Sequence, residues 1–157
     1  MSEYLLDANV LVALTHTQHV RHAAAHAWLA GLGDTDTWST CPMTEAAFIR
    51  LLMNPFVIGD GMGLSAATAI AHLQAMKAWA GARHVFAPDD TTLADPAIDP
   101  SLLARSLVGH SQVTDFHLLN LAASRGARLA TLDRQLAAGL PAPLTTTLHV
   151  IDTVPEE

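Results

Sequence analysis

The sequence predicts an α/β fold in which helices cover both faces of a mostly parallel sheet. Short apolar segments of strand character alternate along the chain with segments whose apolar residues recur at helical spacing. Such alternation is typical of parallel sheets, because each connection between parallel strands carries a helix across one face. Half of the 157 residues are hydrophobic and 15% are charged, which is enough apolar material for a sizeable core. No linker, repeat or low-complexity tract divides the chain, so we expect a single domain over residues 1–157.

Capping and stop signals place the individual elements. Thr44, Ser65 and Thr114 are expected N-caps, and Gly126 is expected to close the helix that Thr114 begins. The expected strands are residues 4–6, 37–41, 84–86, 128–132 and 148–151. The expected helices are residues 8–14, 20–32, 44–53, 65–81, 102–107, 114–126 and 134–139, with one face of the second formed by Val20, Ala24, Trp28 and Leu32. Residues 57–63 and the segment around Pro141 and Pro143 are expected to be loops.

Composition limits the class of protein. A formal net charge of −7 argues against a simple basic nucleic-acid binder, but a nuclease whose carboxylates hold metal remains compatible with it. The single cysteine, Cys41, has no partner for an internal disulfide bond. No apolar run is long enough to span a membrane, and the N-terminus has no signal-peptide pattern, so we expect a cytoplasmic protein.

Two acidic residues stand at the ends of expected strands. Asp7 follows the apolar run 4–6 and precedes a helix, and Asp133 follows the strand 128–132 in the same way. Binding sites of open α/β sheets gather at the carboxyl ends of the strands. Asp7 and Asp133 can therefore be neighbours in space although they are far apart in sequence.

Two further acids begin apolar helix faces. Glu45 shares its face with Phe48, Ile49 and Leu52, at i, i+3, i+4 and i+7. Asp115 shares its face in the same way with Leu118, Leu119 and Ala122. Both carboxylates are therefore expected on the core side of their helices, where an unpartnered charge is costly.

A divalent cation would relieve the repulsion among carboxylates gathered around one cavity. Oxygen ligands favour Mg²⁺ or Mn²⁺, whereas the histidines and the cysteine lack the spacing of a zinc site. Each acid also has a simpler interpretation as a helix-start residue favoured by the helix dipole, and Asp133 as an N-cap. The recurrence of the same strand-end or helix-start context at Asp7, Glu45, Asp115 and Asp133 favours a metal site.

Three segments of the sequence resemble PIN domains, and most of all the VapC toxins of VapBC toxin–antitoxin pairs. They are LLDANVLVAL at 5–14, CPMTEAAFIRLL at 41–52 and VTDFHLLNLAASRGARLATLDRQL at 113–136. The resemblance implies a three-layer α/β/α sandwich and metal-dependent endoribonuclease activity with Mg²⁺ or Mn²⁺. It carries Asp7, Glu45, Asp115 and Asp133 over as the acidic site, with Asn9 and Thr131 lining it. It also implies a VapB antitoxin as partner, and the family habit together with apolar helix surface suggests a homodimer.

Other polar residues have simpler expected roles. Arg50, Arg125, Arg128 and Arg134 lie closest in sequence to the acidic motifs, and we favour Arg50 and Arg134 as contacts for RNA phosphates. The histidines at 19, 22 and 26 are expected to form a solvated helix face, and the glycines at 59, 61 and 63 a mobile loop.

Three other functions remain open. A phosphatase or receiver domain also uses a strand-end aspartate with Mg²⁺, but it usually needs a late lysine, whereas the only lysine here is Lys77. A PIN-like binding module without catalysis would not need the complete acid set. A PIN nuclease outside a toxin–antitoxin pair would have the same sequence features as a toxin.

Overall fold

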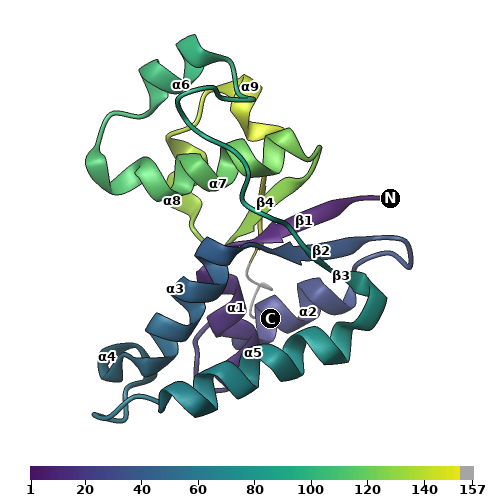
Figure 1. Ribbon diagram of the computed structural model, residues 1–157, viewed down its shortest axis with the longest axis vertical. Coiled ribbons are helices and arrows are strands. Elements are labelled where there is room, and N and C mark those ends of the chain that lie inside the picture. Colours follow the sequence, from purple (N-terminus) through teal and green to yellow (C-terminus); the bar gives the residue numbers. More distant parts are fainter. Residues whose placement is uncertain (153–157) are drawn as a thin grey trace.

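Five parallel strands form one sheet between two layers of helices in the computed structural model, which describes residues 1–152 (Figure 1). The strand order is β3-β2-β1-β4-β5, and every neighbouring pair is parallel. The strands are β1 (Glu3–Leu6), β2 (Thr37–Thr40), β3 (His84–Phe86), β4 (Arg128–Thr131) and β5 (Leu148–Val150). The predicted three-layer α/β/α arrangement is confirmed. The prediction of one domain extends to residue 157, and residues 153–157 lie outside the described part of the chain.

Each face of the sheet has its own layer of helices, which lie on opposite sides of the strands in Figure 1. One layer consists of α1 (Ala8–Thr15), α2 (His22–Ala30), α3 (Pro42–Met53), α4 (Pro55–Ile58) and α5 (Ala66–Ala80). The other consists of α6 (Pro100–Ser106), α7 (Val113–Ser124), α8 (Arg134–Ala138) and α9 (Ala142–Thr145). Among residues 1–152, no helix has the length and apolar character needed to cross a membrane.

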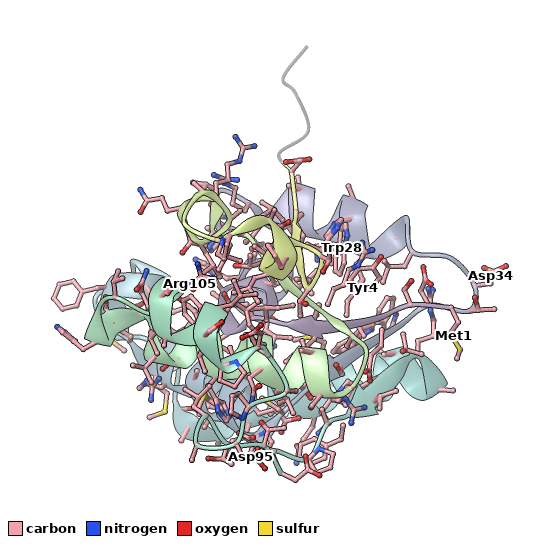
Figure 2. The ribbon with its side chains drawn as sticks, turned by 90° about the horizontal axis from the view of Figure 1, so that it is seen from above. Met1, Tyr4, Trp28, Asp34, Asp95 and Arg105 are labelled. Atoms are coloured by element: carbon pink, nitrogen blue, oxygen red, sulfur yellow. The ribbon has the colours of Figure 1, made fainter. Side chains whose placement is uncertain are left out.

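The sheet has a hydrophobic core on each face, and alternate side chains of β1 contribute to each of them. Leu5 and Leu6 are fully buried, and because neighbouring side chains of a strand point to opposite faces, each enters a different core. Leu5 packs in the cluster with Phe116, and Leu6 packs in the cluster with Phe48. Tyr4 meets Trp28 of α2 edge to face, with ring centroids 5.3 Å apart (Figure 2).

The sheet topology determines where a ligand can bind. The chain moves from β1 to β2 and β3 on one side and then returns to β4 on the other side of β1. The connections after β1 and after β4 therefore leave the sheet toward opposite faces, which opens a crevice at the carboxyl ends of these two strands. Asp7 and Asp133 follow these strands, as the sequence predicts.

Two predicted N-caps are wrong. Helix α3 begins at Pro42, because proline suits the first helical position and Cys41 precedes it as the N-cap. Thr44 lies inside the first turn, where its hydroxyl accepts a hydrogen bond from Cys41 N at 3.0 Å and donates one to Cys41 O at 3.1 Å. Thr114 also lies inside its helix, since α7 starts at Val113 directly after a 3-10 turn. The prediction for Ser65 is confirmed, because its side chain accepts from Thr68 N.

The structure also corrects the second helix. α2 begins at His22, and Val20, which is 91% exposed, lies before it rather than on its buried face. The expected solvated histidine face is confirmed only in part, because His26 is exposed whereas His22 is half-buried and His19 lies before the helix. His22 Nδ1 lies 2.7 Å from Ala13 O, and His26 Nε2 lies 2.8 Å from Leu14 O, so both rings join α2 to the end of α1.

Two expected loops contain short helices. The segment 57–63 begins within α4, and Pro141 is the N-cap of α9. The remaining loop closes on itself, because the Asp60 carboxylate accepts hydrogen bonds from the amides of Met62 and Gly63. At Gly63 the backbone has a φ of 70°, and a Cβ atom there would lie 2.2 Å from Met53 O. The glycine is therefore required for close approach of the chain to the end of α3.

Candidate active site

Asp7 is the most buried acid of the candidate site, with 9% of its surface exposed. Its backbone amide donates to Ala130 O at 3.0 Å, which fixes the end of β1 against β4. Burial raises the pKa of the Asp7 carboxyl, and the negative charge of Asp133 raises it further. A hydrogen bond from the Thr131 hydroxyl to Asp7 Oδ2, 3.0 Å long, partly opposes this effect. Asp7 is therefore a carboxylate with negative charge nearby and little solvent around it.

Asp133 is held in place as the N-cap of α8. Its Oδ1 accepts hydrogen bonds from Gln135 N at 2.9 Å and Leu136 N at 3.2 Å. Its own amide donates to Thr131 Oγ1 at 3.1 Å, so one hydroxyl contacts both Asp7 and Asp133. The capping role that the sequence suggested is correct, and it orients the carboxylate at the end of β4.

Asp115 approaches the same place from the first turn of α7. Its helix face is the expected one, because Leu118, Leu119 and Ala122 are all buried. Desolvation raises the pKa of Asp115 to about 6, and the charges of Asp7 and Asp133 add to this effect. The structure therefore brings three of the four predicted acids within electrostatic reach of one another.

Glu45 makes its contacts elsewhere. Its Oε1 accepts a hydrogen bond of 2.6 Å from Thr40 Oγ1 and one of 2.8 Å from Lys77 Nζ. Its helix face is correct, since Phe48 and Leu52 are fully buried. However, the charges that raise the pKa values of Asp7 and Asp115 come from aspartates, and Glu45 is not among them. The charge of Glu45 is thus compensated by Lys77, a lysine 32 residues further along the chain.

The three aspartates suit a divalent cation in their chemistry. They supply oxygen ligands only, and burial together with the charge of neighbouring aspartates raises the pKa values of Asp7 and Asp115, an effect that a bound cation would oppose. Within residues 1–152, no group of three or more histidine, cysteine or acidic side chains is already arranged to hold a metal ion. A bound cation would therefore require the carboxylates to draw closer together.

The other predicted residues differ in their placement. Thr131 is fully buried and bonded to Asp7, which agrees with a lining position. Asn9 is exposed in the first turn of α1, and its backbone amide lowers the pKa of Asp7. Arg50 and Arg134 are exposed, and Arg134 Nη2 lies 3.9 Å from Asp152 Oδ1.

Arg125 forms an ion pair at the end of the sheet opposite to the aspartates. Its guanidinium donates to both carboxylate oxygens of Glu3, at 2.7 and 3.1 Å. Glu3 begins β1 and Asp7 follows its last residue, so this ion pair is separated from the aspartates by the length of the strand. Arg125 thus stabilises the amino end of the sheet and lies away from the candidate site.

Comparison with known proteins identifies the family. The model of the PIN domain matches residues 4–139. The chain is also 43% identical over 145 residues to Ribonuclease VapC39 of Mycobacterium tuberculosis, which covers 92% of this chain and 98% of the relative. The chain is a PIN-domain protein of the VapC family.

Other VapC proteins support this assignment. Ribonuclease VapC38 of Mycobacterium tuberculosis is 42% identical over 129 residues, or 82% of this chain and 84% of the relative. The fold resembles the crystal structure of VapBC2 from Rickettsia felis bound to a promoter DNA fragment, with a TM-score of 0.63 and 14% identity over 96% of this chain and 99% of that chain. The fold also resembles VapC20 of Mycobacterium tuberculosis, a toxin that cleaves the sarcin–ricin loop. The TM-score is 0.59 and the identity 15%, and the match covers 86% of this chain and 93% of VapC20. At these identities the structural likeness concerns the fold.

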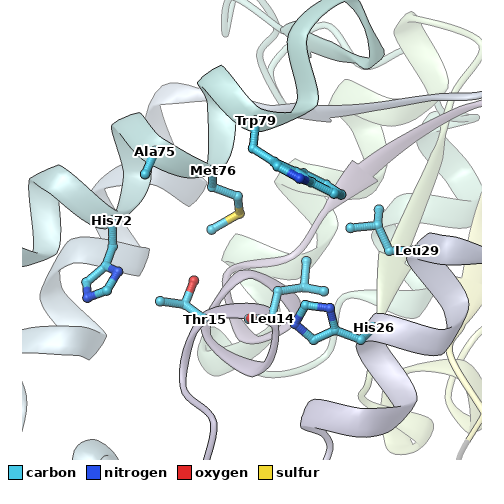
Figure 3. A pocket seen from close by; sticks show the side chains of 8 residues that line it. All are labelled: Leu14, Thr15, His26, Leu29, His72, Ala75, Met76 and Trp79. Atoms are coloured by element: carbon cyan, nitrogen blue, oxygen red, sulfur yellow. Dashed lines mark hydrogen bonds between the residues drawn. The ribbon is translucent and has the colours of Figure 1, made fainter.

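A pocket of this PIN domain lies at the other end of α1 from Asp7. It has a volume of about 300 Å³ and lies between the end of α1 and the helices α2 and α5 (Figure 3). Apolar side chains such as Leu14 and Trp79 line it, together with His26 and His72. None of the four predicted acids contributes to it, so its chemistry is separate from that of the carboxylates.

The partners of Glu45 come from three other elements of the fold and could not be predicted from the sequence. Thr40 ends β2, His84 begins β3 and Lys77 lies in α5, so these residues meet only when the sheet has formed. Thr40 has one hydroxyl proton and donates it to Glu45, so it accepts from His84 Nε2, 2.8 Å away. Burial lowers the pKa of His84, and the Lys77 charge lowers it further, which favours the neutral ring. No local sequence signal marks this network.

Proposed function

We propose that this protein is a metal-dependent endoribonuclease that acts as the toxin of a type II toxin–antitoxin pair. The observation that carries the proposal is the convergence of Asp7, Asp115 and Asp133 at the crevice between β1 and β4, where burial and then the charges of Asp7 and Asp133 raise the pKa of Asp115. Membership of the VapC family supports ribonuclease activity, since the curated relatives VapC38 and VapC39 are named ribonucleases. The carboxylate-only donor set supports Mg²⁺ or Mn²⁺ as the cofactor.

Asp7, Asp115 and Asp133 would bind the cation, and the protein arranges each of them differently. Asp7 is buried and bonded by Thr131, so it has the least freedom to move. Asp133 is oriented by its cap bonds, and Asp115 is half-exposed at the start of α7. When bound, the divalent cation would supply charge stabilisation at the scissile phosphate and acidify the attacking water. The exposed side chain of Asn9 is proposed to line the approach to Asp7.

Glu45 would complete the four-carboxylate set. In the structure its Oε1 is bonded to Thr40 and Lys77, so it needs a change of partner before it can join the aspartates. Arg50 and Arg134 are proposed to contact RNA phosphates, because both are exposed and Arg134 directly follows Asp133. Positive charge beside the acidic site would offset the net charge of −7 during RNA binding.

Two protein partners belong to the proposal. The first is a VapB-type antitoxin that places a basic or apolar segment over the acidic groove and suppresses cleavage. A purified complex that cleaves RNA as fast as the free toxin would contradict this partner role. The second is another copy of the chain, since apolar side chains such as Phe56, Met62 and Trp79 are 93%, 83% and 76% exposed. Light scattering at micromolar concentration should give the mass of a homodimer, and a monomer would refute it.

Incubation with total cellular RNA tests the proposed activity. Reactions contain Mg²⁺, Mn²⁺ or EDTA, with wild-type protein beside Asp7→Asn and Asp115→Asn. Discrete fragments are expected only with metal and only with the wild-type acids, and their ends identify the target. Arg125→Gln serves as a charge-changing control at the far end of β1 and should cleave like wild type. Cleavage that persists in EDTA or in both aspartate variants would contradict the proposal.

A further inference from the structure

Lys77, the only lysine of the sequence, is bound to one of the predicted metal ligands. Its Nζ lies 2.8 Å from Glu45 Oε1, and the two side chains are 33% and 17% exposed. Lys77 is on α5 and Glu45 on α3, and these two helices pack against each other. The ion pair is thus a specific tertiary contact rather than a chance encounter of flexible side chains.

The same oxygen of Glu45 is bonded twice. Thr40 Oγ1 donates to Oε1 at 2.6 Å, so a hydroxyl and an ammonium group share one acceptor. The Lys77 ammonium also lies 5.2 Å from the centre of the Phe86 ring, within the range of a cation–π contact. Lys77 is therefore positioned from two sides, and the negative charge of Glu45 is already compensated.

A divalent cation near Glu45 would meet a positive charge in contact with that carboxylate. Coordination by Oε1 would have to displace the ammonium group or the hydroxyl, and Lys77 would repel the cation even if Oε2 alone were used. The pair is partly exposed, and partly exposed ion pairs are weak, so metal binding can supply the free energy to open it.

We propose that Lys77 competes with the divalent cation for Glu45, so that Glu45 joins the aspartates only when its ion pair with Lys77 opens. Lys77 is then a positioning residue that determines how tightly the fourth carboxylate holds metal. This inference rests on the proposed metal-dependent function, because it presupposes a cation at Asp7, Asp115 and Asp133.

Titration of metal-free protein with Mn²⁺, followed by electron paramagnetic resonance, tests the competition directly. Lys77→Met removes the charge and keeps the length of the side chain, and it should tighten Mn²⁺ binding on the order of fivefold. Lys77→Arg keeps the charge and should bind Mn²⁺ like wild type. Glu45→Gln should abolish the gain, so Lys77→Met in that background should leave the affinity unchanged. Unchanged or weaker binding by Lys77→Met would overturn the proposal, as would a gain that persists with Glu45→Gln.

The single lysine offers a second readout that needs no Lys77 variant. Protein labelled with ¹⁵N-lysine gives one side-chain ammonium signal, that of Lys77. Saturation with Mg²⁺ should move this signal to the position it has in Glu45→Gln, where the ion pair is absent. A signal that stays unmoved at saturating Mg²⁺ would overturn the proposal.

Asp115→Asn separates the two possible failures. If wild type binds Mn²⁺ and Asp115→Asn does not, the proposed metal site stands. The results for the Lys77 variants then test only the competition between Lys77 and the cation. If wild type and Asp115→Asn bind Mn²⁺ equally weakly, the proposed metal site fails and the competition is overturned with it.

Discussion

The hydroxyl of Thr131 donates a hydrogen bond of 3.0 Å to Oδ2 of Asp7. This bond joins the last residue of β4 to the carboxylate that follows β1, the two strands at which the sheet order reverses. Thr131 is fully buried, and it also accepts from the amide of Asp133. One threonine therefore fixes the relative positions of two acids that are far apart in sequence.

Removal of that hydroxyl should weaken both the fold and metal binding. Thr131→Val keeps the shape of the side chain but leaves Asp7 Oδ2 without its donor, which should lower the free energy of unfolding by about 1–3 kcal/mol. The pKa of Asp7 should rise further, because the Thr131 hydrogen bond lowers it. Thermal unfolding and Mn²⁺ titration measure the two effects. Thr131→Ser keeps the hydroxyl and is the control, and equal defects in both variants would show that the hydroxyl is not the cause.

Asp115→Asn should stabilise the metal-free protein above neutral pH. The pKa of Asp115 is raised from 3.8 to about 6 on folding, so the protonated carboxyl is the form that the fold favours. The contribution of Asp115 to stability is therefore fully present below pH 3.8 and is lost as the pH rises through about 6. Asparagine cannot ionise, so the melting temperature of the variant in EDTA should exceed that of wild type at pH 7.5. The free energies of unfolding of the two proteins should differ by on the order of 1 kcal/mol, since solvent screens the half-exposed Asp115 carboxylate.

The pH series and the metal series check that prediction together. Below pH 3.8 the two proteins should melt nearly alike, because Asp115 is mostly protonated in both the folded and the unfolded state. With Mn²⁺ at pH 7.5 wild type should gain stability and overtake Asp115→Asn, which binds the cation less well. A constant difference between pH 3.5 and 7.5 would contradict the raised pKa of Asp115.

Arg134→Gln should weaken RNA binding by a few-fold and reduce the salt dependence of the binding constant by about one phosphate contact. Arg134 is exposed and directly follows Asp133, so its guanidinium lies beside the acidic site where a phosphate would bind. Fluorescence anisotropy over a range of salt concentrations measures both changes. Arg128→Gln is the matched control, because Arg128 is also exposed but begins β4, at the opposite end of the strand. Equal losses in the two variants would indicate a general charge effect.

The positions of the acids could be predicted because local patterns determine them. Asp7 and Asp133 each follow an apolar strand, and strand ends of a parallel sheet converge. Asp115 begins an apolar stripe whose members are all buried, so its direction followed from helical periodicity alone. These inferences need only the alternation of strands and helices.

The contacts of Glu45 could not be predicted in the same way. Its helix face was correct, but its partner Lys77 lies 32 residues further along the chain and reaches it only through the packing of α5 on α3. The histidines of α2 present the same difficulty, because His22 and His26 bond to carbonyl groups of α1 that the sequence pattern does not mark. Helices α3 and α7 begin earlier than Thr44 and Thr114 predict, because Pro42 and a 3-10 turn set the boundaries.

Anomalous diffraction from crystals grown with Mn²⁺ tests the central claim most directly, namely that the aspartates at the ends of β1 and β4 and the start of α7 share a divalent cation. The expected result is a Mn²⁺ peak about 2.2 Å from carboxylate oxygens of Asp7, Asp115 and Asp133, and its absence from crystals of Asp115→Asn. A saturating Mn²⁺ soak that leaves this crevice empty, or places the ion at side chains other than these three, would contradict the account.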